Sequence, residues 1–367
     1  MRILYLTEVN IDVPSSVLTK MNAQIEEWST YGHEIFVASF PIYNVQRKQI
    51  LLSKEAKGFI EYKNSWVKRF PKGGLFNMGN KILSIKKYRN YISKISPDLI
   101  YLREMAAFPG LASLLHKNKV VVESNTVLMN EIKLRNKKLF QLAKLYQNKV
   151  NKKVDGFIGV TNEVTNQFIK YNKPSLTITN GIKIETFNII SPVNNRAQII
   201  MVCSPGCLWH GFDKYIKMAE LLPEMDFHLI GPPKLDFNVS FKNLFLYGYL
   251  SKIELINIYS KMDIAVGTLA LHRKNMQEAS PLKVREYALF GLPMILAYND
   301  TDFTGKDFDF ILQIENSEKN VENNISHITK FINKWKGKRI KIEEVDPLIS
   351  ISNKEKMRLD FFKTIIN

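Results

Sequence analysis

Two glutamates eight residues apart, Glu278 and Glu286, are the side chains of this sequence best placed to do chemistry together. A carboxylate offers two acceptor oxygens, which suits the two hydroxyls of a ribose or the adjacent hydroxyls of a hexose. Lys283 lies between them and adds a positive charge. The three residues predict a site for a ligand that carries both hydroxyls and negative charge.

The residues around them predict a short helix that begins inside this pattern. Ser280 is a favoured N-cap, Pro281 suits the first helical position, and Gly291 ends the helix. The apolar run 263–267 before it and the run 293–297 after it are typical of buried strands. The sequence therefore predicts a strand, loop, helix and strand, and such loops commonly hold ligands in α/β proteins.

The start of that helix is a predicted phosphate site. The first N–H groups of a helix lack partners and carry about half a positive charge, so they attract anions. Lys283, in the first turn, is unfavourable for the helix alone and makes better sense beside a bound anion. Phosphate donors between two carboxylates that bind hydroxyls indicate a nucleotide-sugar.

The pattern Glu278-x7-Glu286, followed by Gly291-Leu292-Pro293, resembles the donor-binding motif of the retaining GT-B glycosyltransferases of family GT4. The resemblance implies that Glu286 holds the nucleotide ribose and that Glu278 faces the donor sugar. It also implies that the residues between them bind the diphosphate through backbone N–H groups. These residues include Ser280, Pro281 and Leu282.

The sequence leaves a structural alternative open for Glu286. A helix carboxylate can lie in solvent and pair with a neighbouring cation, here Lys283 or Arg285. Two glutamates at this spacing also arise by chance in most chains of this length. Their position across a strand, a loop and a helix makes the motif more specific.

The resemblance implies an α/β fold of the GT-B type, with two Rossmann-like doubly wound domains facing a central cleft. The segment Asn180-Gly181-Ile182 and the polar stretch 191–195 mark the passage between the domains. We expect an acceptor domain at 1–182, a nucleotide-sugar donor domain at 183–350, and a C-terminal helix at 351–367 that returns to the first domain. Apolar runs that alternate with helix-like stretches favour parallel sheets in both halves.

Two loops depart from the family pattern. Where the family commonly supplies an Arg and a Lys-Gly pair for the diphosphate, this sequence has His210-Gly211, so Lys283 is expected to carry the charge. Where the family often has paired glycines, it has Ser15 and Ser16, whose hydroxyls could bind an anion or cap the next helix. A structural role also stays open for His210, because a lone histidine is usually structural.

A third departure follows the predicted strand 120–123. The family often has a histidine near the reacting sugar at this place, and this sequence has Glu123-Ser124-Asn125 instead. By the resemblance, Glu123 or Asn125 could take that polar role.

Length and composition limit which classes of protein this chain can belong to. A chain of 367 residues fits two domains, 45% hydrophobic residues are ordinary for a globular protein, and no apolar run is long enough to span a membrane. The N-terminus enters a strand-like segment without a signal peptide, so we expect a cytoplasmic protein. Cys203 and Cys207 match no metal motif and are expected to be buried free thiols. No metal ion or cofactor is expected.

Positive charge is concentrated in the first half. Residues 1–180 hold 28 Lys and Arg against 13 Asp and Glu, a net +15, whereas residues 181–367 hold 24 against 22, a net +2. The segment 44–94 mixes basic and aromatic residues, which suits an interface with phosphates and acyl chains or bases. An anionic membrane face or nucleic acid is the expected partner, with a merely solvated basic surface as the alternative. Nucleic acid is disfavoured because the motif residues lie in the less basic half.

By this resemblance we predict a metal-independent retaining glycosyltransferase. It would move a sugar from a nucleotide diphosphate donor to a glycan or polyprenyl-linked acceptor in the synthesis of surface polysaccharides or glycoconjugates. The N-terminal domain of such enzymes generally receives the acceptor, so the basic half would lie at the inner face of the membrane as a peripheral protein. A nucleotide-sugar epimerase of the same fold and a non-catalytic binder of anions or nucleic acid are the alternatives.

Overall fold

The computed structural model describes residues 1–40, 49–61, 74–135, 137–185, 187, 190–204, 206–231 and 241–367, without the side chains of 74–77, 135 and 137–139. Contacts divide the chain into two compact units. Unit 1 comprises Met1–Thr179 and Ile351–Asn367, and unit 2 comprises Asn180–Ser350. We had predicted the passage between domains at residue 182. Residues 44–48 and 62–73, which belong to the predicted basic and aromatic interface, lie outside the described residues.

Unit 1 is built on a sheet of seven parallel strands in the order β3-β2-β1-β4-β5-β6-β7. Its central strands are buried on both faces, as expected of a parallel sheet covered by helices, and therefore read as unbroken apolar runs. The strands are β1 (Arg2–Thr7), β2 (Glu34–Ser39), β3 (Ala56–Glu61), β4 (Leu99–Arg103), β5 (Val120–Ser124), β6 (Gly156–Gly159) and β7 (Ser175–Thr177).

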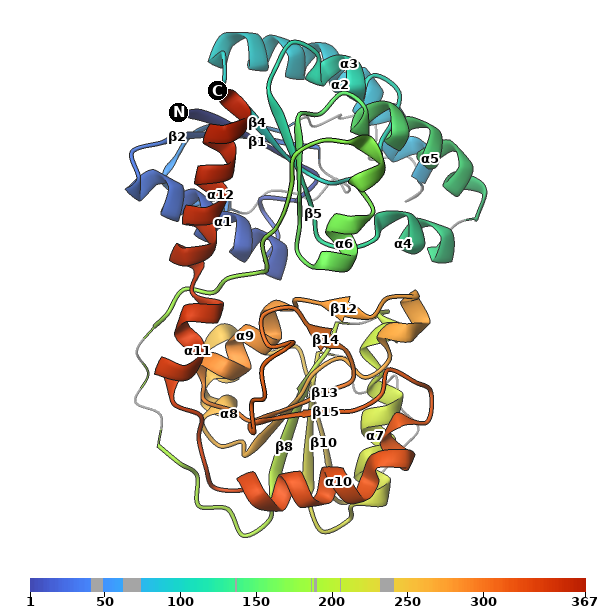
Figure 1. Cartoon of the computed structure of the whole chain (residues 1–367), viewed down its shortest axis with the longest axis vertical. Helices are drawn as coiled ribbons and strands as arrows, with labels where there is room; N and C mark the ends of the chain where they lie inside the picture. Colours follow the sequence, from blue (N-terminus) through green and yellow to red (C-terminus); the bar gives the residue numbers. More distant parts are fainter. Residues whose placement is uncertain are drawn as a thin grey trace. The chain divides into compact units, whose positions relative to one another are not determined.

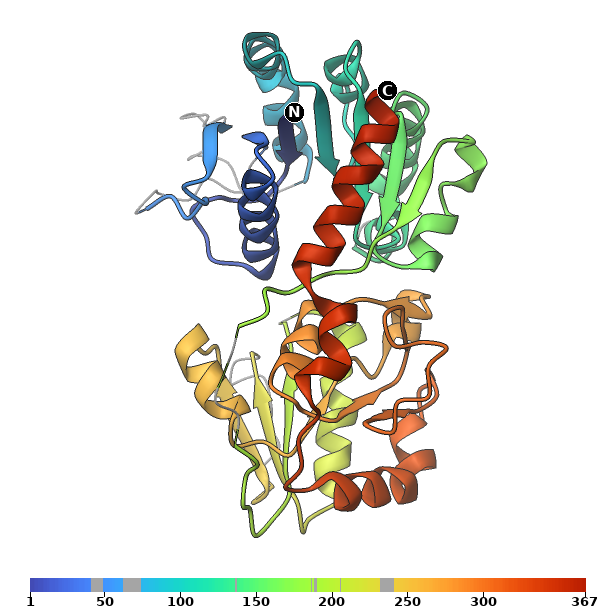
Figure 2. The same ribbon diagram turned by 60° about the vertical axis from the view of Figure 1, so that its left-hand side comes forward.

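Two helices from opposite ends of the chain cover one face of this sheet. α1 and α12 lie side by side (Figures 1 and 2). The ring of Trp28 in α1 packs edge-on against Phe362 of α12 and Tyr101 of β4, with ring centres 5.6 and 5.2 Å apart. The helices of unit 1 are α1 (Ser16–Thr30), α2 (Gly74–Ile95), α3 (Leu111–Leu115), α4 (Leu128–Arg135), α5 (Lys137–Asn151), α6 (Asn162–Asn166) and α12 (Ile351–Ile366).

Unit 2 is built on a sheet of six parallel strands in the order β10-β9-β8-β11-β13-β15. A separate two-stranded sheet pairs β12 with β14. The strands are β8 (Gln198–Val202), β9 (Asp226–Ile230), β10 (Leu244–Gly248), β11 (Ile264–Val266), β12 (Glu278–Ala279), β13 (Met294–Leu296), β14 (Asn299–Asp300) and β15 (Ile311–Gln313).

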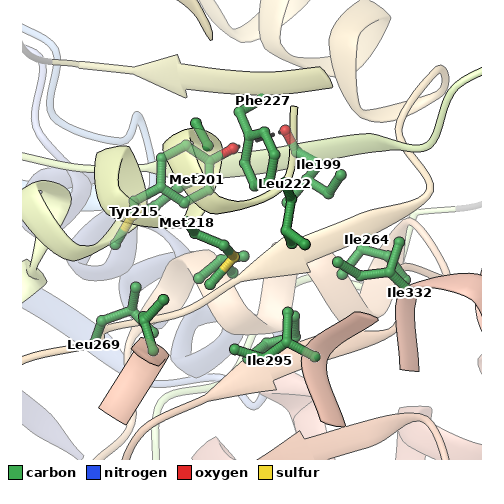
Figure 3. Packing of buried hydrophobic residues seen from close by; sticks show 14 of the residues in the cluster. Ile199, Met201, Tyr215, Met218, Leu222, Phe227, Ile264, Leu269, Ile295 and Ile332 are labelled. Carbon is green, nitrogen blue, oxygen red and sulfur yellow. Dashed lines mark hydrogen bonds between the residues drawn. The ribbon is translucent and has the colours of Figure 1, made fainter. Parts of the chain in front are cut away.

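Helices α7 and α10 bury one face of the second sheet. Figure 3 shows Met218 of α7 and Ile332 of α10 packed with Ile199, Ile264 and Ile295 of the sheet. The helices and 3-10 turns of unit 2 named below are η3 (Leu208–His210), α7 (Phe212–Leu221), α8 (Lys252–Tyr259), η5 (Leu271–Lys274), α9 (Leu282–Leu289), α10 (Asn320–Trp335) and α11 (Ile342–Ile349).

Both sheets have the strand order of a doubly wound fold. In chain order each sheet starts in its middle, grows to one side and then crosses to the other, so the order reverses between β1 and β4 and between β8 and β11. Ligands of such sheets bind outside the carboxyl ends of the strands that flank the reversal. In unit 2 the predicted site residues lie in the segments after β8 and β11 and in the first two turns of α9.

The structure also bears on membrane insertion. Among the helices of the described residues, none combines the length and the apolar character needed to cross a bilayer.

Candidate functional site

Helix α9 is fixed to the carboxyl ends of β8 and β11 by two of its side chains. The hydroxyl of Tyr287 accepts a hydrogen bond from the N–H of Val202 at the end of β8 (3.0 Å) and donates to the carbonyl of Val266 at the end of β11 (3.4 Å). One turn earlier, the ammonium of Lys283 donates to the carbonyl of Val202 (3.0 Å). The start of α9 is thereby held beside the point where the strand order reverses.

The helix begins later than predicted. Pro281 is at the N-cap position, with extended backbone, and Leu282 is the first helical residue. Ser280 is therefore not the cap, and that prediction was wrong. Its hydroxyl is buried and accepts the N–H of Asn180 (2.9 Å), so it is engaged by the start of unit 2. The predicted end is confirmed, because Gly291 follows the C-cap with a φ of +65°.

Glu286 lies in the second turn of α9 and is partly buried. Its Oε2 accepts a hydrogen bond from the hydroxyl of Tyr259 at the end of α8 (3.1 Å), and burial raises the pKa of its carboxyl. Lys283 and Arg285 form their hydrogen bonds elsewhere, so the alternative of an exposed Glu286 paired with one of them is wrong. Tyr259 orients the carboxylate, and a carboxylate has further lone pairs for a ligand.

Two acidic triplets that sequence reasoning missed are engaged by basic side chains. The sequence contains Asp-x-Asp at 300–302 and again at 307–309, and paired carboxylates of this kind can hold a divalent cation. The buried guanidinium of Arg285 instead pairs with both carboxylates of the first triplet, and Asp309 pairs with Lys334 (3.0 Å). Within the described ranges, no group of three or more His, Cys, Asp or Glu side chains could hold a metal ion.

We had expected Glu278 in a loop. The structure places it in the short strand β12. β12 pairs in parallel with β14, and the N–H of Asn299 donates to the carbonyl of Gln277 (2.9 Å). This pairing fixes the backbone that carries Glu278, whose side chain is partly buried. The eight-residue spacing to Glu286 therefore runs from a fixed strand to the second turn of a fixed helix.

The ammonium of Lys283 is a partly buried charge with no described carboxylate paired to it. Burial lowers its pKa, and the groups that act in the opposite direction are the thiols of Cys203 and Cys207. Its described hydrogen bond goes to a backbone carbonyl. Burying a cation without a counter-charge is costly, so this arrangement is suited to an anionic ligand.

His210 lies near Lys283, at the end of η3 in the loop after β8. Burial first, and then the charges of Lys283 and Lys274, lower the pKa of its imidazole to about 2, so the ring is neutral at ordinary pH. Its Nδ1 accepts the N–H of Ser204 (3.0 Å), which places the ring proton on Nε2. His210 therefore offers a ligand one N–H donor and no charge.

Gly211 lets the loops after β8 and β11 approach each other. Its φ of +73° favours glycine, and a Cβ there would lie 2.9 Å from the Cβ of Leu269 and 3.1 Å from the backbone nitrogen of Ala270. The N–H of Leu269 donates to the carbonyl of His210 (3.0 Å), and the N–H of Ala270 donates to that of Trp209 (3.2 Å). The structure thus brings His210 and Gly211 against the loop that leads to Glu278.

Ser16 is in unit 1, at the first position of α1, and is exposed. The cap of that helix is its neighbour Ser15, whose hydroxyl accepts the N–H of Leu18 (3.1 Å). Of the two roles left open for the serine pair, capping is therefore performed by Ser15. Anion binding by Ser16 stays a prediction.

Glu123 belongs to a buried ion cluster of unit 1. It is fully buried and pairs with Lys20 of α1 (2.7 Å), Arg103 of β4 (3.3 Å) and Arg358 of α12 (3.3 Å). These three cations hold the pKa of its carboxyl below the usual range although burial acts in the opposite direction. We had expected Glu123 or Asn125 near a reacting sugar. The cluster engages Glu123, and Asn125, which accepts from Lys20 (2.9 Å), is the remaining candidate.

No family model matches the chain, and no curated protein matches it by sequence. Solved structures resemble it over its whole length. The sucrose-phosphate synthase of Thermosynechococcus elongatus has a TM-score of 0.74 at 13% identity, over 100% of this chain and 99% of that one. HepE of Anabaena in complex with UDP-glucose has a TM-score of 0.65 at 14% identity, over 99% of this chain and 100% of that one.

A third structure of this kind is the UDP-GlcNAc 2-epimerase from Neisseria meningitidis bound to UDP-GlcNAc. Its TM-score is 0.56 at 12% identity, over 99% of this chain and 100% of that one. At such low identities the likeness shows the fold alone. The chain has the α/β fold of the GT-B glycosyltransferases, with two Rossmann-like domains built on parallel sheets.

Proposed function

We propose that the chain is a glycosyltransferase of the GT4 type. It moves a sugar from a nucleotide diphosphate donor to a glycan or lipid-linked acceptor, with retention of configuration and without a metal ion. The observation that carries this proposal is the partly buried ammonium of Lys283 in the first turn of α9, which is bonded to the carbonyl of Val202 and has no described carboxylate partner. The loop that follows Val202 carries the N–H donor of His210. A diphosphate supplies the negative charge that this group of donors requires.

In the proposed reaction an acceptor hydroxyl bonds to the anomeric carbon as the bond from that carbon to the diphosphate oxygen breaks. The proton of the hydroxyl passes to the departing diphosphate. Lys283, the Nε2–H of His210 and the first N–H groups of α9 stabilise the charge that develops on the leaving oxygen. Fixed positive charge does the work that a divalent ion does in other enzymes.

The remaining predicted residues bind and orient the donor in this proposal. Glu286 accepts the ribose hydroxyls, and Glu278 positions the donor sugar. The backbone of Ser280, Pro281 and Leu282 forms one wall of the diphosphate site, and the backbone at Gly211 forms the other. HepE, which has the same fold, binds UDP-glucose, and this supports a nucleotide-sugar as the ligand class.

The UDP-GlcNAc 2-epimerase of the same fold favours a second candidate, a nucleotide-sugar epimerase. Its TM-score of 0.56 is lower than the 0.74 of the sucrose-phosphate synthase. An epimerase needs no acceptor and would leave the net +15 of residues 1–180 without a role. We therefore rank it second.

Unit 1 receives the acceptor in this proposal and binds the inner face of an anionic membrane. Its helices α2 and α5 expose leucines, Leu83 at 67% and Leu145 at 53%, beside the exposed lysines Lys86 and Lys144. Each such cation contributes about 1 kcal/mol near an anionic bilayer. We expect the protein to sediment with vesicles that contain anionic phospholipid, to a far smaller extent with neutral vesicles, and not to bind duplex DNA.

The deciding experiment has two steps. Thermal-shift assays with a panel of nucleotide-sugars identify the donor, and release of nucleoside diphosphate is then measured with and without candidate acceptors. A transferase releases it when an acceptor is added, whereas an epimerase converts the sugar with no acceptor present. If no nucleotide-sugar in a broad panel shifts the melting temperature, the proposal is wrong.

Lys283→Ala tests the assignment of the leaving-group site. Because the charge on the leaving oxygen is largest in the transition state, we expect kcat to fall far more than donor affinity. Equal losses in both would contradict the role given to Lys283.

A further inference from the structure

The buried ion cluster of unit 1 holds one more cation than carboxylate. Its members are Lys20 of α1, Arg103 of β4, Glu123 of β5, and Glu355 and Arg358 of α12. Burial lowers the pKa of the Lys20 ammonium to about 8 although Glu123 acts in the opposite direction. The other two cations lower it further. Because buried charges are costly unless they are balanced, this cluster is suited to one further anion.

Glu104, the residue after Arg103, is not the missing counter-charge. Its carboxyl is hydrogen-bonded to the hydroxyl of Ser124 and accepts from the amide of Gln147 (3.2 Å). Burial raises the pKa of that carboxyl to about 7. The cations of the cluster hold Glu123 as a carboxylate, with a lowered pKa, and they do not do so for Glu104.

Arg103 is the cation of this cluster that a ligand can reach. Its guanidinium carries five N–H groups, and within the described ranges its one partner is Glu123, which lies 3.3 Å from Nη1. The side chain of Arg103 is 16% exposed, whereas those of Lys20 and Arg358 are 4% and 0% exposed. Most of the guanidinium donors are therefore left for another group.

Asn125, two residues after Glu123, adds a further donor. Its Oδ1 accepts from the ammonium of Lys20 (2.9 Å), which fixes the orientation of the amide. Its Nδ2 is buried, and none of the described residues accepts from it. A buried N–H group without a partner is costly, so this amide is suited to a ligand that accepts a hydrogen bond.

Both donors lie at the edge of the sheet where a ligand is expected. Arg103 is the last residue of β4, and Asn125 follows the last residue of β5. The strand order of unit 1 reverses between β1 and β4, and doubly wound sheets bind ligands outside the carboxyl ends of the strands at such a reversal. A guanidinium matches two oxygens of a phosphate or a carboxylate, so an anionic group fits these donors.

Resting on the acceptor role of unit 1 in the proposed function, we propose that Arg103 and Asn125 bind an anionic group of the acceptor, a phosphate or a carboxylate, and thereby select charged acceptors over neutral ones. The anion supplies the negative charge that the ion cluster lacks. Glu123 holds the guanidinium and Lys20 holds the amide, so both donors are fixed before the acceptor arrives, which lowers the entropy lost on binding.

NMR of the full chain with isotope-labelled arginine tests this proposal with three small probes. Geranyl phosphate represents a lipid-linked phosphate, methyl glucuronide an acidic sugar, and methyl glucoside a neutral sugar. The Nε–H signal of Arg103, assigned by its absence from Arg103→Gln, reports on this site alone. We expect a saturable shift of this signal with an anionic probe and none with the glucoside. The anionic probe with the lower Kd identifies the source of the anion.

Two variants remove the site in different ways. Calorimetry, with excess nucleoside diphosphate present to fill the donor site, should show that Arg103→Gln raises the Kd of the preferred probe about tenfold or more, the effect of one charge-assisted hydrogen bond. Asn125→Asp keeps an acceptor for Lys20 and places a carboxylate where the anion would bind. It should abolish binding of the probe without lowering the melting temperature, because it balances the cluster.

Arg2→Gln is the matched control. Arg2 also pairs with one carboxylate, Glu34 (3.0 Å), but it lies at the amino end of β1 and its side chain is 55% exposed. We expect the control to bind the anionic probe as the wild type does. All three variants should keep the wild-type affinity for nucleoside diphosphate, because the residues proposed to contact it belong to unit 2.

The outcomes separate this proposal from the one on which it rests. If the Arg103 signal responds to no anionic probe, or equally to the neutral one, the anion site is refuted even where nucleotide-sugars bind. If the signal responds to an anion but no nucleotide-sugar binds, the anion site stands and the transferase is refuted. An equal loss of probe affinity in Arg2→Gln and Arg103→Gln would show a general effect of charge and would also overturn the anion site.

Discussion

Glu286 is held by a single described hydrogen bond, from the hydroxyl of Tyr259 (3.1 Å). If its carboxylate binds the ribose, Glu286→Ala should weaken nucleotide binding by about 1.5 to 3 kcal/mol, the range for hydrogen bonds to a charged group. Tyr259→Phe is the control, because it removes the orienting hydroxyl and keeps the carboxylate, so its loss should be below about 1 kcal/mol. Calorimetry compares the variants, and an unchanged affinity in Glu286→Ala would remove Glu286 from the site.

Glu104, which follows β4 in unit 1, keeps its proton to an unusually high pH in the folded protein. The hydroxyl of Ser124 is hydrogen-bonded to the carboxyl of Glu104 and lies 2.8 Å from the carbonyl of Thr126, yet a hydroxyl has one proton to donate. If Glu104 is protonated, it donates to Ser124, which donates to Thr126, and both contacts are satisfied. Burial, with a smaller contribution from Glu131, raises the pKa of Glu104 to about 7.

This proton makes the stability of the protein depend on pH. The carboxyl of Glu104 has a pKa of about 7 when folded and near 4.5 when unfolded, so the folded state binds the proton more tightly. The free energy of unfolding therefore falls as the pH rises from 4.5 to 7. Glu104→Gln keeps a donor to Ser124 at every pH.

We expect Glu104→Gln to raise the melting temperature above that of the wild type at pH 8, where the wild-type carboxylate is charged and buried. Near pH 4.5 the two proteins should melt at similar temperatures. The difference in unfolding free energy at pH 8 should be on the order of 1 to 3 kcal/mol. Thermal melts at the two pH values check this, and parallel pH profiles for variant and wild type would contradict it.

Among the elements, the buried strands were predictable and the shortest ones were not. The predicted strand at 120–123 became β5, which is one residue longer, because parallel strands buried on both faces need no alternation and show as unbroken apolar runs. β12 has only two residues, which is too short for any period to show. The strand under Glu278 could therefore not be predicted.

The partners of the site residues were also beyond a single sequence. Tyr287 bonds to Val202, 85 positions earlier, and Tyr259 bonds to Glu286, 27 positions later. Each tyrosine fits the pattern of an ordinary core residue, and no local spacing marks its hydroxyl. The eight-residue motif predicted the candidate site residues of α9 and β12. Tertiary packing determines which side chains bond to them.

The close approach of two loops at Gly211 can be tested by substitution. In Gly211→Ala a left-handed φ costs about 1 to 2 kcal/mol, and crowding against Leu269 and Ala270 adds about 1 to 3 kcal/mol. The shifted loop should also carry His210 away from the anion site and weaken nucleotide binding. Denaturant melts and calorimetry measure the two effects.

Gly305→Ala is the control for that variant. Gly305 has a similar φ of +79°, but nothing lies within 4 Å of the added Cβ. The free energy of unfolding of this variant should fall only by the cost of the backbone conformation, about 1 to 2 kcal/mol, and its nucleotide affinity should be unchanged. Equal effects of the two variants on binding would mean that the contact between the two loops does not position His210.

Across the whole molecule, the two units differ in how the chain builds them. Unit 2 is one continuous segment whose core residues all lie within it. Unit 1 needs α12 from the far end of the chain, which supplies Leu359, Phe362 and Ile365 to its core. α12 also supplies Arg358 to the buried cluster around Glu123, and its Glu355 accepts from the indole of Trp28 (2.8 Å).

We therefore expect residues 180–350 to fold when expressed alone and residues 1–179 not to. Removing α12 takes away three buried apolar side chains, each of which contributes about 2 kcal/mol to the free energy of unfolding. It also leaves the ion cluster without one of its partners, which costs about 3 to 5 kcal/mol. The sum is most of the stability of a typical domain. Joining 351–367 to 1–179 through a flexible linker should restore folding, because the lost contacts are all within unit 1.

Circular dichroism, amide NMR dispersion and thermal melts distinguish the fragments. The 180–350 fragment should also bind nucleoside diphosphate, since every residue proposed to contact the diphosphate belongs to it. A 1–179 fragment as stable as its fusion to α12 would show that the first unit does not depend on the C-terminal helix.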